Sequence, residues 1–368
     1  MLTTAVVSFN LAQRKAPLLS ALAQASAAAP FDVLAVAVQE LAPFAEQMRR
    51  SHATRLSPAM RCVVAAFDSE LAGAATCVAA LEHGAVGLAV WVRPSACPAQ
   101  PPIYAKTALG PLALSSKAAV AVALRFGPSS TSTVAFVSAH LPAGIGPAAD
   151  FARNRAFRAA ATRLHFAGRS LFDCHSVFFA GDLNYRAALS ASFADDGLRQ
   201  AMRCNAAFPA FTEPAVAFRP TYKLLASGTY DPRRSPAWCD RILTYTRHNA
   251  AAPRIAAWRE ARPAPDDSSS LAPASITCLR YWSLPVAGSD HLPVYARFRL
   301  DLPRLVNHDP DIPVIADPLR SYYLALGFVA DRSVGAVHYV LTDPAALLLL
   351  LAVLSATAIC LAQGSYTT

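Results

Sequence analysis

The sequence predicts a mixed α and β sandwich over residues 1–300, and three observations indicate this fold class. Short apolar runs are separated by clusters of Pro, Gly, Ser and Asp, which is typical of buried strands joined by turns. Stretches with a helical pattern lie between some of these runs. Of the 368 residues, 54% are hydrophobic and only 15% are charged, which excludes a disordered or collagen-like chain and supplies a large core.

Individual helices and strands can be predicted within residues 1–300. Residues 18–29 predict an amphipathic surface helix. Arg14 and Lys15 precede them, but a targeting peptide would have its charges and its apolar run at the very start of the chain. Residues 148–166 predict a second helix. Four apolar runs predict strands that end in polar side chains: 6–9 before Asn10, 33–38 before Glu40, 134–137 before His140, and 177–180 before Asp182 and Asn184. We expect these polar groups to gather on one rim of the sandwich.

The C-terminal part of the chain predicts a membrane anchor. Residues 344–362 carry no charge and consist mainly of Leu, Ala, Val and Ile. About 19 residues at 1.5 Å each give roughly 28 Å, which suits a single transmembrane helix in a thin bilayer such as that of the endoplasmic reticulum or another endomembrane. A buried C-terminal helix is the alternative. Arg320 and Arg332 precede this segment and no Lys or Arg follows it, so the charge bias places residues 1–300 in the cytoplasm and only residues 363–368 on the far side.

Residues 301–343 are interpreted as a linker that could form an interfacial helix. The segment is rich in Pro and Asp near its start and becomes aromatic and apolar around 322–329 and 334–341. As a flexible chain, its roughly 43 residues would span about 36 Å, while a 300-residue domain has a radius of gyration of about 19 Å. The domain could therefore reach the membrane that holds its own anchor.

The charge balance favours anionic partners. Lys and Arg number 33 and Asp and Glu number 24, giving a formal net charge of +9. Phosphates, nucleic acids and acidic lipid surfaces all fit such a charge, and the charge alone does not choose among them.

The polar residues that follow the predicted strands suit metal-assisted phosphate chemistry. Asn10 and Glu40 offer hard oxygen ligands of the kind that Mg²⁺ prefers. Asp182, with Asn184 two residues further on, could accept a proton from a water molecule aligned for in-line attack on phosphorus.

Two imidazoles complete this interpretation. His291 could donate a hydrogen bond to the phosphate, and a carboxylate on its other ring nitrogen would favour the charged form. Asp240 is the candidate for that carboxylate. His140 is a second imidazole for the charge that develops on the equatorial oxygens.

Four segments carry a family resemblance. They read GDLNYR at 181–186, FRPTYK at 218–223, SPAWCDRIL at 235–243 and SDHLPV at 289–294. In this order and spacing, over about residues 6–300, the chain resembles the inositol polyphosphate 5-phosphatase family of the endonuclease, exonuclease and phosphatase superfamily. The resemblance implies an α+β fold in which two sheets and two helical layers form a four-layered α/β/β/α sandwich.

The resemblance also implies roles for individual residues. It assigns Asn10 and Glu40 to a magnesium ion and Asp182 and Asn184 to the nucleophilic water. The phosphate site is completed by His140, Asp240, Asp290 and His291. Residues implied to contact the rest of the substrate are Lys117, Tyr185, Arg186, Tyr222, Lys223, Arg234 and Arg241.

Two segments depart from the family pattern. Residues 115–118 read SSKA where the family usually has Gly-Asn-Lys-Gly, and residues 138–141 read SAHL where it has Asn-Ser-His-Leu. Leu292 stands where a basic residue is frequent. Lys117 and His140 are retained, so these changes bear on substrate preference and turnover more than on the type of reaction.

The sequence therefore predicts a monomeric, membrane-anchored, Mg²⁺-dependent phosphatase. It would hydrolyse the 5-phosphate of phosphoinositides, such as phosphatidylinositol 4,5-bisphosphate, and could act on soluble inositol polyphosphates, with no nucleic-acid partner expected. One alternative is a phosphodiesterase of the same superfamily, a nuclease or a sphingomyelinase. Another is a weakly catalytic, membrane-tethered adaptor that binds phosphoinositides.

Overall fold

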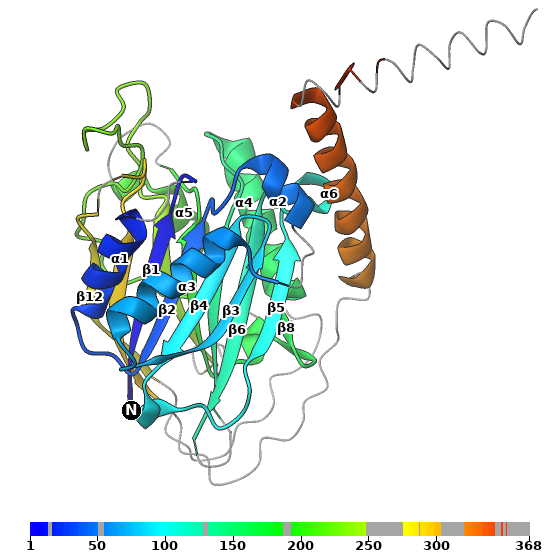
Figure 1. The fold of residues 1–368 in the computed structure, drawn as a ribbon. Helices are drawn as coiled ribbons and strands as arrows, with labels where there is room; N and C mark the ends of the chain where they lie inside the picture. Colours follow the sequence, from blue (N-terminus) through cyan, green and yellow to red (C-terminus); the bar gives the residue numbers. More distant parts are fainter. Residues whose placement is uncertain are drawn as a thin grey trace, which may run out of the picture.

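Two β-sheets face each other at the centre of the molecule and carry helices on their outer faces (Figure 1). The structure is a computed structural model that describes residues 1–13, 17–50, 55–127, 132–186, 193–247, 275–286, 288–302, 320–342, 347–348 and 351. The predicted α+β fold with two sheets is confirmed.

The first sheet has six strands within the described residues, in the order β12-β13-β1-β2-β4-β3. Its strands are β1 (Leu2–Asn10), β2 (Val33–Gln39), β3 (Thr76–His83), β4 (Val86–Val92), β12 (Ser275–Ser283) and β13 (Val294–Asp301). Helices α1 (Pro17–Ala27) and α3 (Pro58–Leu71) cover its outer face. Helix α3 begins where Ser57 accepts a hydrogen bond from the Met60 backbone amide at 3.0 Å and Pro58 occupies the first turn, the usual chemistry of a helix start.

The second sheet has five strands in the described part of the chain, in the order β11-β10-β7-β6-β5. Its strands are β5 (Ile103–Ala108), β6 (Ala118–Phe126), β7 (Ser132–His140), β10 (Ser176–Asp182) and β11 (Asp240–Thr246). Helices α4 (Pro147–Arg163) and α5 (Gly197–Arg203) pack on its outer face. The short elements are α2 (Phe44–Arg50), β8 (His165–Phe166), β9 (Arg169–Ser170) and four 3₁₀ turns, η1 (Pro94–Ala96), η2 (Pro111–Ala113), η3 (Leu171–Asp173) and η4 (Phe193–Asp195).

Continuous apolar runs form the central strands because both of their faces are buried. In β2, Val33 and Ala35 pack between the two sheets, while Leu34 and Val36 pack under α1 and α3. The same alternation in β10 sends Phe178 to the space between the sheets. The four strands predicted from such runs, and the helix predicted at 148–166, are confirmed by β1, β2, β7, β10 and α4.

The predicted polar rim is confirmed by the register of two parallel strand pairs. β1 and β2 run in parallel, so that Asn10 pairs with Gln39 at their carboxyl ends. β7 and β10 also run in parallel, and Asp182 pairs with His140. Since parallel strands end at the same edge of a sheet, each sheet brings its polar residues to one edge, and the packing of the sheets joins the two edges.

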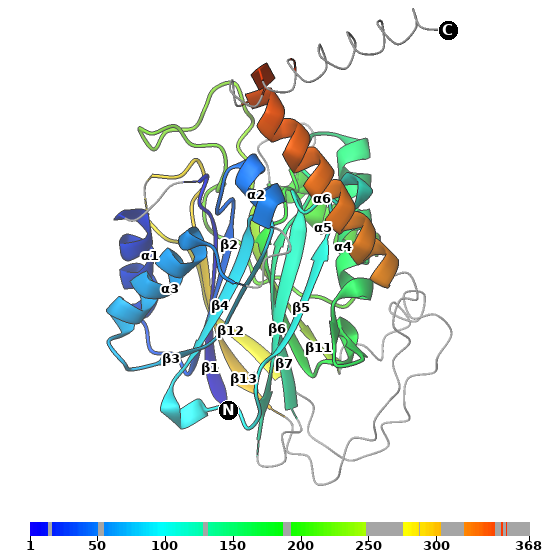
Figure 2. The ribbon, with the colours of Figure 1, turned by 45° about the vertical axis from the view of Figure 1, so that its right-hand side comes forward.

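The predicted linker contains a helix of 23 residues, α6 (Arg320–Thr342). This helix lies against α2 and the η2 turn at the side of the sandwich, as Figure 2 shows. The sequence predicted a flexible chain over these residues. In the structure they form a helix that packs on the domain.

Within the described residues no helix is long and apolar enough to cross a bilayer. The predicted anchor, residues 344–362, lies outside them except for positions 347, 348 and 351.

Candidate active site

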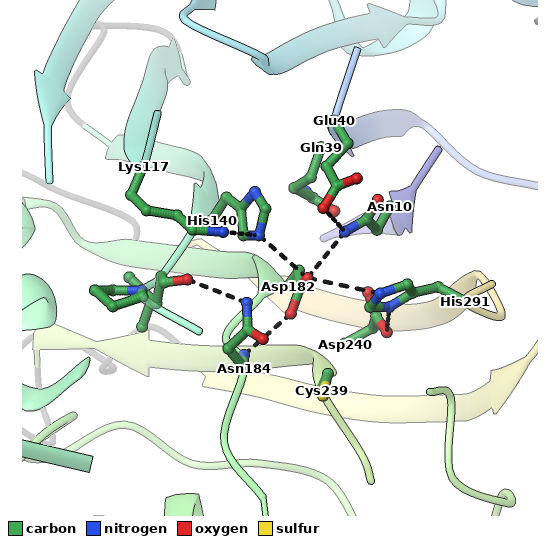
Figure 3. Close-up of polar contacts among 12 residues, drawn as sticks. Asn10, Gln39, Glu40, Lys117, His140, Asp182, Asn184, Cys239, Asp240 and His291 are labelled. Carbon is green, nitrogen blue, oxygen red and sulfur yellow. Dashed lines mark hydrogen bonds and ion pairs between the residues drawn. The ribbon is translucent and has the colours of Figure 1, made fainter. Parts of the chain in front are cut away.

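Polar side chains from both sheets meet at the joined strand ends (Figure 3). Asn10 ends β1, His140 ends β7 and Asp182 ends β10, while Glu40 directly follows β2. Asp240 begins β11 opposite Asp182 in the antiparallel register. The structure thereby brings together residues that are up to 281 positions apart in the chain, since His291 also contacts this cluster.

Asp182 lies at the centre of the cluster. Its Oδ2 accepts a hydrogen bond from Asn10 Nδ2 at 2.9 Å and lies 3.3 Å from His140 Nε2 and 3.9 Å from His291 Nε2. Its Oδ1 accepts a hydrogen bond from the Asn184 backbone amide at 3.1 Å. The side chain is only 2% exposed. One carboxylate is therefore surrounded by donors from both sheets.

The surroundings of Asp182 keep it ionised. Burial alone would raise the pKa of this carboxyl, but the positive potential of His140, His291 and Lys117 and the hydrogen bond from His140 outweigh burial and lower it. The carboxylate is therefore ready to accept a hydrogen bond from a water molecule at neutral pH.

His291 is held in its charged form between two carboxylates. Its Nδ1 lies 2.8 Å from Asp240 Oδ2, and the same oxygen accepts a hydrogen bond from Thr221 Oγ1 at 2.6 Å. Burial would lower the pKa of His291, but Asp240 and Asp182 outweigh it and raise that pKa to about 9. The predicted role of Asp240 as the partner of His291 thus has the geometry that it requires.

His140 contacts Lys117 on the side away from Asn10 (Figure 3). Burial lowers the pKa of His140, and the ammonium group of Lys117 lowers it further. Burial also lowers the pKa of Lys117. The same ring nitrogen, His140 Nε2, faces both the Lys117 amino group and Asp182 Oδ2, so the three groups share protons in one row beside the centre of the cluster.

Backbone geometry adds a requirement at Gly181. A Cβ atom there would lie 1.9 Å from the carbonyl oxygen of Ala139, so only glycine lets β10 approach β7 this closely. Glu40 and Asn184 adopt left-handed backbone conformations with φ of 53° and 57°. Such conformations are costly for side chains other than Gly and Asn and concentrate at functional sites.

A divalent cation fits the oxygen side of the cluster. Asn10 Nδ2 lies 3.2 Å from Glu40 Oε1 and 2.9 Å from Asp182 Oδ2, so a positively polarised group already bridges two carboxylates. The Asn10 amide oxygen accepts a hydrogen bond from the Ala12 backbone amide at 3.0 Å, and the amide would have to turn over to ligate an ion between Glu40 and Asp182. Carboxylate and amide oxygens are the donor set that Mg²⁺ prefers.

A second group, Asp182, Asp240 and His291, presents ligand atoms within 4.8 Å of one another in the described residues. The His291 imidazole is charged, however, and its Nδ1 is engaged by Asp240. An ion at this group would therefore compete with the His291 proton and with the contact between Nδ1 and Asp240.

Two predicted substrate contacts are not brought to the site. The Arg241 guanidinium group is fully buried, 2.9 Å from Asp196 and in contact with Glu213 through both Nε and Nη2. Tyr185 is also fully buried and donates a hydrogen bond to Asn154 Oδ1 at 2.6 Å. Both side chains support the site from within the core, because their strand and loop positions point away from the rim.

Other predicted contacts lie at the rim. Arg186 donates a hydrogen bond to Asn184 Oδ1 at 3.2 Å and stacks on the Tyr222 ring, which in turn lies 4.7 Å from the His291 ring. Lys223 pairs with Asp290 at 3.5 Å, and that carboxylate is 30% exposed and adds to the negative potential that raises the pKa of His291.

Arg234 is exposed in the loop before β11. Its backbone amide donates a hydrogen bond to the Asp231 carbonyl. Within the described residues its side chain makes no hydrogen bond or ion pair with the cluster around Asp182.

Three supporting residues were missed by the sequence analysis. Thr221 holds Asp240, and Ser289 Oγ donates a hydrogen bond to the Asn10 carbonyl at 2.7 Å while accepting one from the His291 amide. Gln39 Nε2 donates to Ser138 Oγ at 3.2 Å and so ties β2 to β7 below the site. Thr221 and Ser289 lie within the motif segments, and that proximity was the available signal.

Comparisons with known proteins agree with this geometry. A family model described as Endonuclease/Exonuclease/phosphatase family 2 matches residues 7–297. The inositol-1,4,5-trisphosphate 5-phosphatase 1 of Schizosaccharomyces pombe is 31% identical over 201 residues, which cover 50% of this chain and 16% of that protein. Human synaptojanin-1 is 33% identical over 252 residues, covering 59% of this chain and 15% of that protein. The matched regions thus span about a sixth of the length of these relatives.

Solved structures share the fold. The inositol polyphosphate 5-phosphatase domain of a synaptojanin, in complex with inositol (1,4)-bisphosphate and calcium ion, has a TM-score of 0.64 and 22% identity over 90% of this chain and 91% of that chain. A Cimex nitrophorin in a ferrous NO complex has a TM-score of 0.59 and 22% identity over 82% of this chain and 99% of that chain. Since one fold occurs in proteins with such different names, function has to be argued from the site.

Proposed function

Because the chain belongs to endonuclease/exonuclease/phosphatase family 2, we propose that it is a metal-dependent phosphatase that removes the 5-phosphate from inositol phosphates or phosphoinositides. One observation carries the proposal: a buried, ionised Asp182 is held between Asn10, His140 and His291 where the two sheets join. The similarity to an inositol-1,4,5-trisphosphate 5-phosphatase and to synaptojanin-1 supports the substrate class.

The residues have distinct tasks in this reaction. Asp182 orients a water molecule in line with phosphorus and accepts its proton, while Asn184 fixes the carboxylate through its backbone amide. The water oxygen bonds to phosphorus, the bond between phosphorus and the ring oxygen breaks, and a proton replaces phosphorus on that oxygen. His291, charged below a pKa of about 9, donates a hydrogen bond to a phosphate oxygen. The pair of Lys117 and His140 offers further donors on the other side of Asp182.

Glu40, Asp182 and the Asn10 amide oxygen would hold a divalent cation, and we propose Mg²⁺. When bound, the ion neutralises charge on the phosphate group. Two cationic side chains at the rim, Arg186 and Lys223, suit the further phosphates of an inositol ring.

Phosphate release from matched substrates tests the proposal. With the full chain and Mg²⁺, we expect release from inositol 1,4,5-trisphosphate but not from inositol 1,4-bisphosphate, which lacks the 5-phosphate, and none after chelation of the metal. Release from phosphatidylinositol 4,5-bisphosphate in vesicles would extend the substrate class to lipid. Faster cleavage of duplex DNA or sphingomyelin would favour a phosphodiesterase instead, and binding without release would favour an adaptor.

We further propose that residues 344–362 anchor the protein in an endomembrane such as the endoplasmic reticulum, with the domain in the cytoplasm. The lack of charge in this segment supports an anchor. The direction of α6 supports an anchor too, because this helix ends at the same end of the molecule as the carboxyl ends of β1 and β2 (Figures 1 and 2). A membrane that holds this segment would then lie near the site, where a lipid headgroup is needed.

Vesicle flotation tests the anchor. We expect the full chain to float with phosphatidylcholine vesicles and a chain that ends at Asp343 to remain in solution. Both should release phosphate from soluble inositol 1,4,5-trisphosphate at the same rate, because the shorter chain keeps α6. A full chain that stays in solution, or a short chain that still floats, would contradict the proposal.

A further inference from the structure

Helix α6 lies outside the region that matches the family, since that match ends at residue 297. It nevertheless packs against two segments that lead to the site. One is α2, which begins four residues after Glu40 and whose Phe44 ring lies 5.5 Å from the His338 ring of α6. The other is the η2 turn, which precedes Lys117.

The η2 turn has an unusual backbone that α6 contacts closely. Leu112 and Ala113 are consecutive residues with φ of 52° and 60°, a left-handed conformation that costs energy for side chains of this kind. Gly327 of α6 approaches this turn so closely that a Cβ atom would lie 2.7 Å from the Ala113 carbonyl oxygen. The strained turn is therefore held by close packing with the helix.

A buried carboxylate fixes the end of this turn. Asp331, one helical turn after Gly327, is 0% exposed, and its Oδ1 accepts a hydrogen bond from the Ser115 backbone amide at 2.9 Å. From the opposite side, Gly84 packs so tightly that a Cβ atom would lie 2.1 Å from the Ser115 carbonyl oxygen. Asp331 thus contacts the amide of Ser115, and the turn that joins β3 to β4 packs against its carbonyl group.

The position of Ser115 sets the position of Lys117. Only Ser116 separates the two, and β6 begins at Ala118, so the backbone leads directly from the Asp331 contact to the lysine. Lys117 contacts His140 and contributes to the potential that keeps Asp182 ionised. A shift of Ser115 would therefore move the ammonium group away from the cluster.

We propose that Asp331 is a positioning residue of the active site, acting through Ser115 to hold Lys117 against His140. The inference rests on the proposed function for its kinetic consequence. It means that helix α6 is needed for full activity of the catalytic domain. Burial of a carboxylate is costly unless it is hydrogen-bonded, which accounts for the direct contact with a backbone amide.

A double-mutant cycle in the full chain tests the route through Lys117. We expect Asp331→Ala to lower kcat for phosphate release by about 10-fold, since small displacements of a catalytic group carry losses of up to about 100-fold. Asp331→Asn should restore most of the rate, because its amide oxygen still accepts the Ser115 hydrogen bond. In a Lys117→Ala background, Asp331→Ala should have no further effect.

Matched variants separate positioning from general damage. Ser333→Ala, on the exposed side of α6, should leave kcat and the melting temperature unchanged. Gly327→Ala, which pushes on the same turn, should reproduce the effect of Asp331→Ala. Independent, multiplicative losses from Asp331→Ala and Lys117→Ala would overturn the proposal, as would failure of Asp331→Asn to restore the rate.

A spectroscopic measurement keeps the inference testable even if no phosphate is released. The ¹⁵N resonances of the His140 ring, assigned with a His140→Gln variant, report the contact with Lys117. We expect Lys117→Ala and Asp331→Ala to shift them in the same direction and Ser333→Ala to leave them in place. Unchanged resonances in Asp331→Ala would refute the positioning role, whereas a shift without any turnover in the wild-type chain would refute only the proposed function.

Discussion

Replacement of Asp182 by Asn is expected to lower kcat for phosphate release by at least about 10³-fold, since it removes a proton acceptor and a charge at once. The amide has the same shape but only one oxygen, so it can keep the contact from Asn10 at Oδ2 or the one from the Asn184 backbone amide at Oδ1, but not both. What is lost is the ionised group that aligns the attacking water. Steady-state kinetics with inositol 1,4,5-trisphosphate would measure this change.

With Mg²⁺ at a saturating concentration, so that loss of a proposed metal ligand is compensated, the same variant should not weaken substrate binding. Asp182 carries a negative charge next to the expected phosphate position, so its removal lessens repulsion of the substrate. We therefore expect KM to stay constant or fall while kcat decreases strongly. This pattern indicates loss of an interaction made in the transition state.

Asp301→Asn is the matched control for Asp182→Asn. Asp301 lies at the carboxyl end of β13, where it pairs with Ser275 of β12 at the far end of the sheet from the site. Its replacement should change neither kcat nor KM. A wild-type rate in Asp182→Asn would contradict the assignment of Asp182 as the group that orients the water.

Replacement of Arg241 by Ala is expected to lower the free energy of unfolding by about 3–5 kcal/mol, the usual cost of breaking a buried ion pair from one side. The guanidinium group is 0% exposed and neutralises two carboxylates, Asp196 and Glu213. Asp196 also caps α5 through a hydrogen bond from the Arg199 amide at 3.1 Å. Without Arg241, both carboxylates would be left buried without their cation, and urea unfolding would measure the loss.

The comparison variant is Arg233→Ala. Arg233 also pairs with an aspartate, Asp231, but its side chain is 82% exposed, and water screens such pairs. We expect no measurable change in stability from this variant. If Arg241→Ala instead kept the stability and raised KM, the substrate contact implied by the family resemblance would be restored and the buried role refuted.

The position of Arg241 shows why a sequence motif does not by itself tell which of its residues face the cluster around Asp182. Asp240 and Arg241 are neighbours in one motif, yet successive side chains of a strand point to opposite faces. Asp240 reaches His291 at the rim, and Arg241 enters the core toward Glu213. The motif identified the segment, and the register of β11 against β10 decided which of its residues face the site.

Helix α6 shows a different limit. The aromatic and apolar pattern around 322–341 indicated a helix, but it did not show which surface of the domain this helix would pack against. Gly327 and Asp331 are one helical turn apart on the same side, and only the packing of the chain shows that this side meets the η2 turn.

The central strands and the polar groups that end them could be predicted from the amino-acid sequence, because apolar runs and the residues that terminate them are local properties of the chain. The chemistry that we propose also came from the sequence, since Asn10, Glu40, Asp182 and His291 are of residue types that can bind metal or activate water. Which side chains contact one another could be seen only in the folded chain. Those contacts depend on strand register and sheet packing, which join residues such as Ser115 and Asp331 across distances in the chain that no local pattern spans.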